Sequence, residues 1–174
     1  PRQPQDAIRH GIVLVPEDRK LHGLVLDHPI AENIGYCNPD ALGKNGFVTA
    51  RRIRDFAAEN IKRLGVKGRG QQKASEMSGG NQQKVVLAKW LARNPHVVVL
   101  DEPTRGIDVG ARSSIYEIIR DLAAEGRSVI VVSSDLEEVL GVSHRIMVMA
   151  HGRQAGILDR SEASDVSVME LATA

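Results

Sequence analysis

The stretch "SGGNQQKVVLAKWLARNPHVVVLDEPTRG", residues 78–106, decides the fold because it joins a glycine turn, a helical segment and a short apolar run. The apolar run is "VVVL" at 97–100, and continuous runs of this kind are typical of parallel strands that are buried on both faces. Asp101 and Glu102 follow it directly. The two acids are therefore expected at the carboxyl end of a buried strand, where open α/β sheets bind their ligands.

Three more apolar runs predict further strands, at residues 12–15, 129–132 and 146–149. Between the runs at 97–100 and 129–132, apolar residues from Ala111 to Leu122 recur at three- and four-residue steps, which predicts a helix that Gly126 closes. A shorter helix is expected from Asp135 to Leu140. From residue 96 onward this order of strands and helices predicts an open α/β sheet, to which residues 153–158 add an edge strand.

Residues 27–94 have a different pattern, because they contain no strand-like runs. Two helices are expected there, over residues 50–64 and 80–92, separated by a loop rich in glycine and polar residues. The tail is predicted to form a short helix or to lack fixed structure. The chain is thus expected to consist of a partial core lobe at 1–26, a helical insertion at 27–94, a second part of the core at 95–160 and a tail at 161–174.

The composition excludes several classes of function. The 23 basic and 22 acidic side chains leave a net charge of +1, and one Trp, two Tyr and two Phe are too few for a base-stacking platform, so nucleic acid is not an expected partner. The single cysteine, Cys37, cannot form an internal disulfide, and the six histidines show no zinc-ligand spacing. No apolar run approaches the roughly 18 residues of a membrane span. Any membrane contact is therefore expected to go through a partner.

Two short motifs indicate phosphate chemistry. Two carboxylates at a strand end, Asp101 and Glu102, suit a divalent metal and an activated water. Ser78 is placed to cap the following helix, and Gly79 and Gly80 leave its first amides open to an anion. Each motif alone also fits ordinary structure, namely two solvated acids or a simple loop before a helix. The two motifs together, joined by one helix and one strand, favour a nucleotide site.

This order of motifs resembles the ABC-type ATPase family, in which a signature motif, its helix and the Walker B strand follow one another. The resemblance implies that the signature residues contact the γ-phosphate of an ATP held by the opposite subunit. It also implies that Asp101 holds Mg²⁺, in most cases through water, and that Glu102 is the catalytic carboxylate. Asp108, in "TRGIDVGAR", matches the D-loop aspartate. The signature residues are Ser78, Gly79, Gly80, Asn81 and Gln82.

Two positions depart from the usual family pattern. Ser134, in "VVSSDLEEV", stands where the family usually has the γ-phosphate-sensing histidine, and Glu17, in "VPEDRK", stands where it usually has the Q-loop glutamine. Together with "PEDRKLHGL" and "SSDLEEVLGVSHRIMVM", these replacements look like the second nucleotide-binding domain of the tandem ATPases of bacterial monosaccharide importers of the ribose, galactose and xylose type. In that group both replacements are usual, so Ser134 is still expected to take part in catalysis and Glu17 in nucleotide handling.

The resemblance carries expectations for the whole assembly. It implies a partial P-loop NTPase domain of the ABC type, with a mostly parallel sheet and an inserted helical subdomain, that uses ATP and Mg²⁺. The implied partners are a second nucleotide-binding domain, a transmembrane sugar permease and, indirectly, a periplasmic or extracellular sugar-binding protein. The implied location is the cytoplasmic face of the bacterial inner or plasma membrane, as a peripheral subunit. Residues 17–34 are the expected surface for the permease, and the alternative is a solvated charge cluster.

No phosphate loop of the form GxxxxGK[ST] occurs in the sequence. The chain is therefore expected to be the C-terminal part of the second nucleotide-binding domain of a tandem protein that powers sugar import. By itself it is expected to bind ATP weakly and to be inactive as an ATPase. Two alternatives remain open at this point: a non-transport ABC-type ATPase, and a catalytically inactive docking or regulatory fragment of the same fold.

Overall fold

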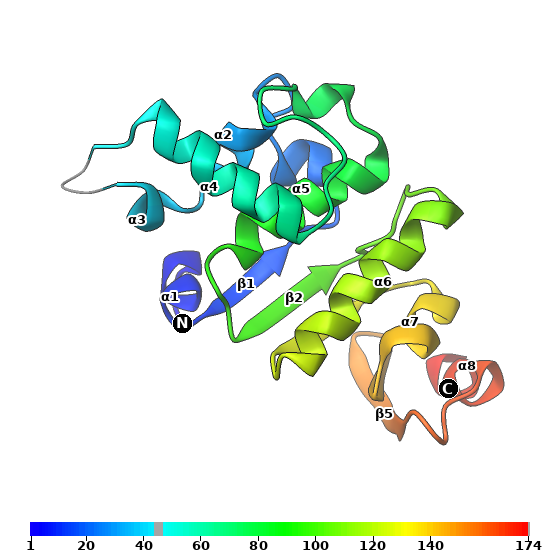
Figure 1. The fold of residues 1–174 in the computed structure, drawn as a ribbon. Helices are drawn as coiled ribbons and strands as arrows, with labels where there is room; N and C mark the ends of the chain where they lie inside the picture. Colours follow the sequence, from blue (N-terminus) through cyan, green and yellow to red (C-terminus); the bar gives the residue numbers. More distant parts are fainter. Residues whose placement is uncertain (44–46, 174) are drawn as a thin grey trace. The chain divides into compact units, whose positions relative to one another are not determined.

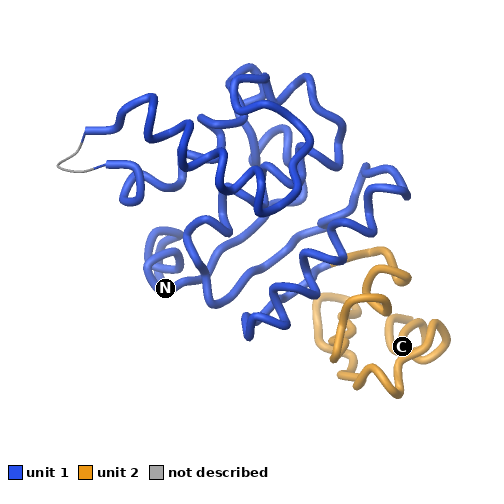
Figure 2. The backbone as a smooth tube through the Cα atoms, viewed as in Figure 1, with its two compact units in different colours: residues 1–132 blue, residues 133–174 orange. Residues whose placement is uncertain are grey.

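The computed structural model describes residues 1–43 and 47–173. The chain divides into two compact units, residues 1–132 and 133–174, which Figure 2 shows in different colours. Each unit has its own sheet and its own helices. The two units are therefore described one after the other.

The expected boundaries between lobes differ from the boundary between these units. Unit 1 contains the whole predicted helical insertion, residues 27–94, together with the strands on either side of it. The predicted core segment, residues 95–160, extends over both units. Residues 44–46 of the insertion and residue 174 of the tail lie outside the described residues. The predicted lobe boundaries stay a prediction.

The sheet of unit 1 has three parallel strands in the order β1, β2, β3. The strands are β1 (Ile12–Val15), β2 (Val97–Asp101) and β3 (Ser128–Val132). Val15 pairs with Leu100, and Asp101 pairs with Val132. The carboxyl ends of all three strands thus reach the same edge of the sheet, as the apolar runs predicted.

Only one face of this sheet is buried. Val13, Val98 and Leu100 are at most 3% exposed. On the opposite face, Leu14 and Ile130 are each 51% exposed. The prediction that these strands are buried on both faces is therefore wrong for the described residues. The physical reason is that the helices in contact with β1 and β3, which are α1 (Pro4–Arg9), α5 (Gly79–Leu91) and α6 (Val109–Ala124), leave the second face uncovered.

The long helix α6 follows the predicted periodicity. Ile115, Ile119 and Leu122 are its buried residues, and they recur at four- and three-residue steps along one side of the helix. The helix ends at Ala124, and Gly126 has a φ of +82°, a conformation that favours glycine after a helix. The predicted helix and its stop are confirmed.

The helical insertion is built around a short helix that the sequence pattern did not predict. This helix, α2 (Ile30–Gly35), contacts both α4 (Ala50–Arg63) and α5, and Figure 1 shows the three gathered together in unit 1. At its centre Asn33 is fully buried, where its side chain accepts from the amide of Val25 and donates to the carbonyls of Val25 and Pro29. The elements of the insertion are α2 (Ile30–Gly35), α3 (Pro39–Leu42), α4 (Ala50–Arg63), the 3₁₀ turn η2 (Ala74–Glu76) and α5.

Unit 2 carries an antiparallel hairpin, although the sequence order predicted one more strand of the open sheet. Its elements are α7 (Leu136–Val142), β4 (Arg145–Ala150), β5 (Arg153–Asp159) and α8 (Asp165–Thr173). Among the described residues β4 pairs only with β5, which corrects the expectation that residues 146–149 continue the sheet of β3. The reason is local: His151 and Gly152 both have positive φ, as a tight hairpin turn requires. The predicted edge strand, now β5, and the tail helix α8 are both present.

Candidate functional site

The acidic pair lies where the sequence placed it. Asp101 is the last residue of β2, and Glu102 leaves the sheet with a φ of +44°, which is uncommon for a residue with a side chain. The Glu102 amide donates to the carbonyl of Val132, so the left-handed turn is anchored to the end of β3. A backbone conformation of this kind costs about 1–3 kcal/mol, and it persists only where the surrounding structure fixes it. Such conformations concentrate at functional sites. The turn brings two successive carboxylates to the carboxyl edge of the sheet.

The loop after Glu102 is a series of tight turns. The amide of Arg105 donates to the carbonyl of Glu102, and the amide of Ile107 donates to the carbonyl of Thr104, which is 2% exposed. Asp108 then occupies the N-cap position of α6, where its carbonyl accepts from later amides but its carboxylate makes no capping hydrogen bond. The loop is thus held by backbone hydrogen bonds and continues directly into α6.

Ser78 begins α5, as predicted, but its side chain does not cap the helix. The Ser78 hydroxyl instead accepts a hydrogen bond of 3.0 Å from the side-chain amide of Asn81, and no side-chain capping bond is formed. The Asn81 oxygen in turn accepts from the amide of Lys67 at 2.8 Å. The predicted Ser78 cap is therefore wrong in detail, because Asn81 engages the hydroxyl.

The two signature glycines lie in close contact with other parts of the chain. A Cβ atom on Gly79 would lie 2.8 Å from Nη2 of Arg19 and 3.1 Å from the carbonyl oxygen of Gly106. A Cβ atom on Gly80 would lie 2.8 Å from the Cβ of Ala111. Real Cβ atoms do not approach other heavy atoms this closely. The sequence explained these glycines by access for an anion, and the structure adds the close approach of α5 to the loop and to α6.

Gln82 is held entirely from within the chain. Its side chain is buried, with the residue 4% exposed. Its amide nitrogen donates to the carbonyl of Ala74 at 3.0 Å, and its amide oxygen accepts from Nε of Arg19 at 3.4 Å. Both polar ends of the side chain are thus used to connect α5 to neighbouring segments.

Arg19 is the central residue of this region, and sequence reasoning missed it. Besides Gln82, it bonds the loop after the acidic pair: Nη1 donates to the carbonyl of Arg105 at 2.9 Å, and Nη2 to that of Gly106 at 3.1 Å. Glu17, two residues earlier, forms an ion pair with the Arg105 side chain. The structure thus brings together three motifs that are far apart in sequence. The sequence "EDRK" predicted only a charged turn. The groups that accept hydrogen bonds from Arg19 lie 63 to 87 residues away, and no local pattern indicates them.

Asp18 fixes the turn that carries Arg19. Its carboxylate accepts from the amides of Leu21 and Lys20 at the start of the π-helical turn η1 (Arg19–Gly23). The bond from Leu21 is the largest influence and, with the bond from Lys20, lowers the pKa of Asp18 even though partial desolvation acts to raise it. The carboxylate is therefore ionised at neutral pH and caps the turn.

Ser134 belongs to unit 2, in the bend before α7. The neighbouring Asp135 caps this helix, accepting from the amide of Glu138 at 3.2 Å, and its own amide donates to the Ser133 hydroxyl at 3.0 Å. All the other predicted site residues lie in unit 1. Within unit 1 the structure therefore brings the signature, D-loop and Q-loop-like segments together, while Ser134 precedes α7 in unit 2.

The side chains of Asp101 and Glu102 suit a metal site that the protein fills only in part. Within residues 1–43 and 47–173, no group of three or more His, Cys, Asp or Glu side chains could hold an ion as a closed protein cage. Asp101 and Glu102 provide adjacent carboxylates at one strand end. Mg²⁺ commonly binds through one or two carboxylates and takes its remaining ligands from phosphates and water. These residues fit a Mg²⁺ ion that arrives with a phosphorylated ligand.

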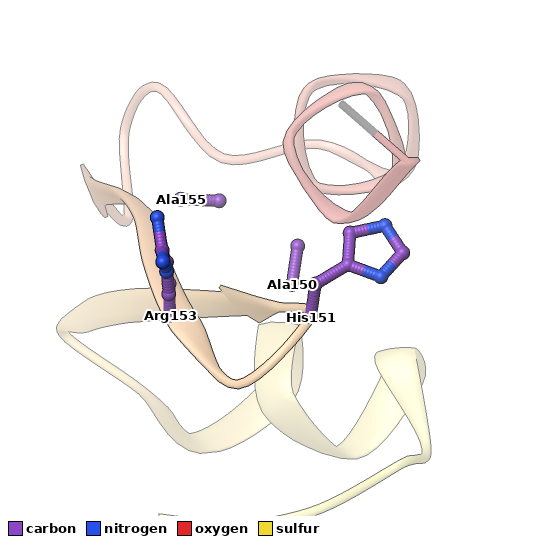
Figure 3. Close-up of a pocket in the computed structure, with 4 residues that line it drawn as sticks. All are labelled: Ala150, His151, Arg153 and Ala155. Carbon is purple, nitrogen blue, oxygen red and sulfur yellow. The ribbon is translucent and has the colours of Figure 1, made fainter.

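A surface hollow lies elsewhere, at the turn of the β4–β5 hairpin in unit 2 (Figure 3). It is lined by Ala150, His151, Arg153 and Ala155. None of the predicted site residues contributes to it.

Comparison with known proteins identifies the family. Residues 2–105 match the family model described as ABC transporter. The chain belongs to this family. It is 50% identical over 98% of its length to the ribose import ATP-binding protein RbsA of Bacillus cereus, and 52% identical over 95% of its length to ribose import ATP-binding protein RbsA 1 of Streptomyces avermitilis. The ABC-type resemblance of the sequence is thereby confirmed.

Solved structures agree with the expected fold class. The chain superposes on MJ1267, an ATP-binding cassette of an ABC transporter, with a TM-score of 0.78 and 24% identity, covering 98% of this chain and 71% of that one. It superposes on the cassette MJ0796, solved as a dimer bound to ADP and Pi, with a TM-score of 0.72 and 25% identity, covering 90% of this chain and 66% of that one. The α/β fold of a partial cassette is confirmed.

The match covers only part of the relatives. The chain spans about a third of the length of the ribose import proteins, 35% for the Bacillus cereus protein and 32% for the Streptomyces avermitilis protein. None of the helices in the described residues is long and apolar enough to cross a membrane.

Proposed function

We propose that this chain is part of the second ATP-binding domain of a protein that powers monosaccharide import through an ABC permease. The observation that carries the proposal is its 50% identity over 98% of the chain to a ribose import ATP-binding protein. The junction of the Glu17, signature and D-loop segments in unit 1 supports it, since it joins the proposed permease surface to the proposed nucleotide-contacting segments.

The proposed reaction is hydrolysis of ATP to ADP and inorganic phosphate. Phosphoryl transfer depends mainly on positioning and on stabilising the charge of the transferring group. A Mg²⁺ ion bound with the nucleotide would supply part of that charge stabilisation, and Asp101 would hold it. Glu102, fixed at the strand end by its bond to Val132, orients the attacking water and accepts its proton. Ser134 donates a hydrogen bond to phosphate or water in place of a histidine.

The signature segment and Asp108 serve a different nucleotide from the acidic pair. Ser78 to Gln82, at the start of α5, complete the ATP site of a second nucleotide-binding domain that closes head to tail on this one. The N-terminal amides of a helix favour the negative charge of a γ-phosphate. Glu17 and the following residues, up to residue 34, contact the permease. A periplasmic or extracellular sugar-binding protein acts on this complex indirectly, and the subunit is peripheral at the cytoplasmic face of the membrane.

The proposal is tested with the full-length ATPase and its permease in vesicles. Glu102→Gln keeps the shape of the side chain but removes the base, so ATP hydrolysis and ribose uptake should both fall about 10²- to 10⁴-fold while ATP binding persists. The matched control is Glu117→Gln, at an exposed position of α6, which should leave both rates unchanged. Unchanged hydrolysis in the Glu102 variant would contradict the assignment. Hydrolysis that stays uncoupled from ribose, xylose and galactose uptake in the wild type would favour a non-transport ATPase.

We further propose that the isolated 174-residue chain binds Mg-ATP weakly and does not hydrolyse it. The basis is the lack of a GxxxxGK[ST] loop, whose amides and lysine cradle the phosphates in P-loop proteins. Titration calorimetry with Mg-ATP should give no saturable heat. Micromolar binding would refute this part of the proposal and leave the assignment of the full-length protein standing.

A further inference from the structure

Arg19 connects two segments that lie far apart in the sequence. Its guanidinium donates to Gln82 on α5 and to the carbonyls of Arg105 and Gly106 in the loop after the acidic pair. Three acceptors on two segments are thus bound by one planar group. Gly79 is part of the same contact, since its missing Cβ leaves the space that Nη2 occupies. Only arginine presents several N–H donors in a rigid fork of this kind.

The turn that carries Arg19 is itself fixed to α5. A Cβ atom on Gly23, at the end of η1, would lie 2.9 Å from Cγ2 of Val86, so the turn packs directly on the helix. Asp18 caps the start of the same turn. Glu17 adds a second connection to the loop through its ion pair with Arg105. Residues 17–23 are thus joined both to α5 and to the loop at residues 105–108.

We propose that Arg19 is a positioning residue that makes the signature segment, residues 78–82, and the loop at residues 105–108 move as one body with residues 17–23. The proposed role of Arg19 is to act through the segments that it holds. The structural part of this inference concerns contacts within unit 1. Its consequence for hydrolysis rests on the proposed function.

The structural part is tested on the chain itself by hydrogen exchange. Arg19→Ala should speed amide exchange about tenfold in both segments at once, as read from Gln82 and Ile107, whose amides bond Ser78 and Thr104. Arg19→Lys should resemble Arg19→Ala, because an ammonium cannot satisfy three separated acceptors. The matched control, Arg54→Ala on an exposed position of α4, should leave both segments unchanged. Faster exchange in only one segment, or in neither, overturns the inference.

A second variant separates this effect from simple loss of folding. Gly79→Ala keeps the arginine but puts a methyl group 2.8 Å from its Nη2, so the guanidinium must move and both segments should again exchange faster. Amides of β2 serve as the internal reference and should exchange as in the wild type. Gly79→Ala that leaves the loop at residues 105–108 protected overturns the inference, because the guanidinium would then not be the connection.

The functional consequence is tested in the full-length ATPase. Arg19→Ala should lower kcat for ATP hydrolysis about tenfold or more and change KM for ATP by less than about threefold, since misplaced groups slow chemistry more than binding. Glu102→Gln in the same preparation reports on the proposed function alone. If Glu102→Gln stops hydrolysis while Arg19→Ala keeps the wild-type kcat, the inference fails and the function stands. If Glu102→Gln has no effect, the proposed function fails, and hydrogen exchange alone decides the role of Arg19.

Discussion

The starts of α5 and α7 carry predicted site residues of similar type, but they are built differently. At α5, Ser78 makes no capping bond, and the helix start is held by Arg19 and by the close approach of Gly80 to Ala111. At α7, Asp135 caps the helix with its side chain. The first start is held by contacts with distant segments, and the second carries a local side-chain cap. A serine or aspartate before a helix therefore does not reveal what holds the helix start.

The two helix starts also differ in how their polar groups are satisfied. Both ends of the Gln82 side chain on α5 are bonded within the chain. On α7, Glu138 is 1% exposed, and neither of its carboxylate oxygens has a hydrogen-bond partner among the described residues. Burying a carboxylate without partners is costly, and an apolar group of similar size in its place avoids that cost. The α5 start is thus complete within this chain, whereas the α7 start leaves one polar group unsatisfied.

The largest expected effect comes from a substitution that disrupts the contact between the start of α5 and α6. Gly80→Ala should destabilise unit 1 by about 1–3 kcal/mol, because its methyl group would overlap Ala111 on α6. Gly110→Ala is the matched control, because a Cβ there meets nothing within 4 Å. It should stabilise the chain by about 0.5–1 kcal/mol through its better helix propensity. Urea unfolding measures both, and equal shifts in the two variants would contradict the packing argument.

The next substitution lies on α7 and is expected to raise the stability of the chain. Glu138→Met should stabilise the chain by about 1–3 kcal/mol, because it removes a buried carboxylate that has no partner among the described residues. Glu137→Met, at the exposed neighbouring position, should change the free energy of unfolding by less than about 0.5 kcal/mol. A loss of stability in the Glu138 variant would show that the carboxylate has a favourable partner in solution.

The smallest effects compare the two caps directly. Asp135→Ala should cost about 1 kcal/mol, since it removes a capping bond to the amide of Glu138. Ser78→Ala should cost no more than about 0.5 kcal/mol, since its hydroxyl bonds Asn81 and not the helix amides. Thermal unfolding of the two variants, side by side, gives the comparison. A larger loss for Ser78→Ala than for Asp135→Ala would reverse the assignment of which start is locally capped.

Much of the fold was predictable because its signals are local. The runs at β1, β2 and β3 and the periodic residues of α6 depend only on neighbouring residues, and each became the expected element. The short helix α2 was not predictable, since six residues carry too little periodicity and its place depends on the buried Asn33. The partner of β4 was also missed, because an apolar run does not state which strand it pairs with.

The candidate site was likewise predictable only in part. The residue types at Asp101, Glu102 and the signature segment, and their place at a strand end and a helix start, follow from the sequence alone. Sequence also supplied the family resemblance. The tertiary structure alone decided that Arg19 and Glu17 meet the loop at residues 105–108 and that Gly79 and Gly80 lie against Arg19 and Ala111. It also decided that one face of the unit 1 sheet stays exposed. Local patterns encode the conformation of neighbouring residues, whereas these features depend on contacts between residues that only the folded chain brings together.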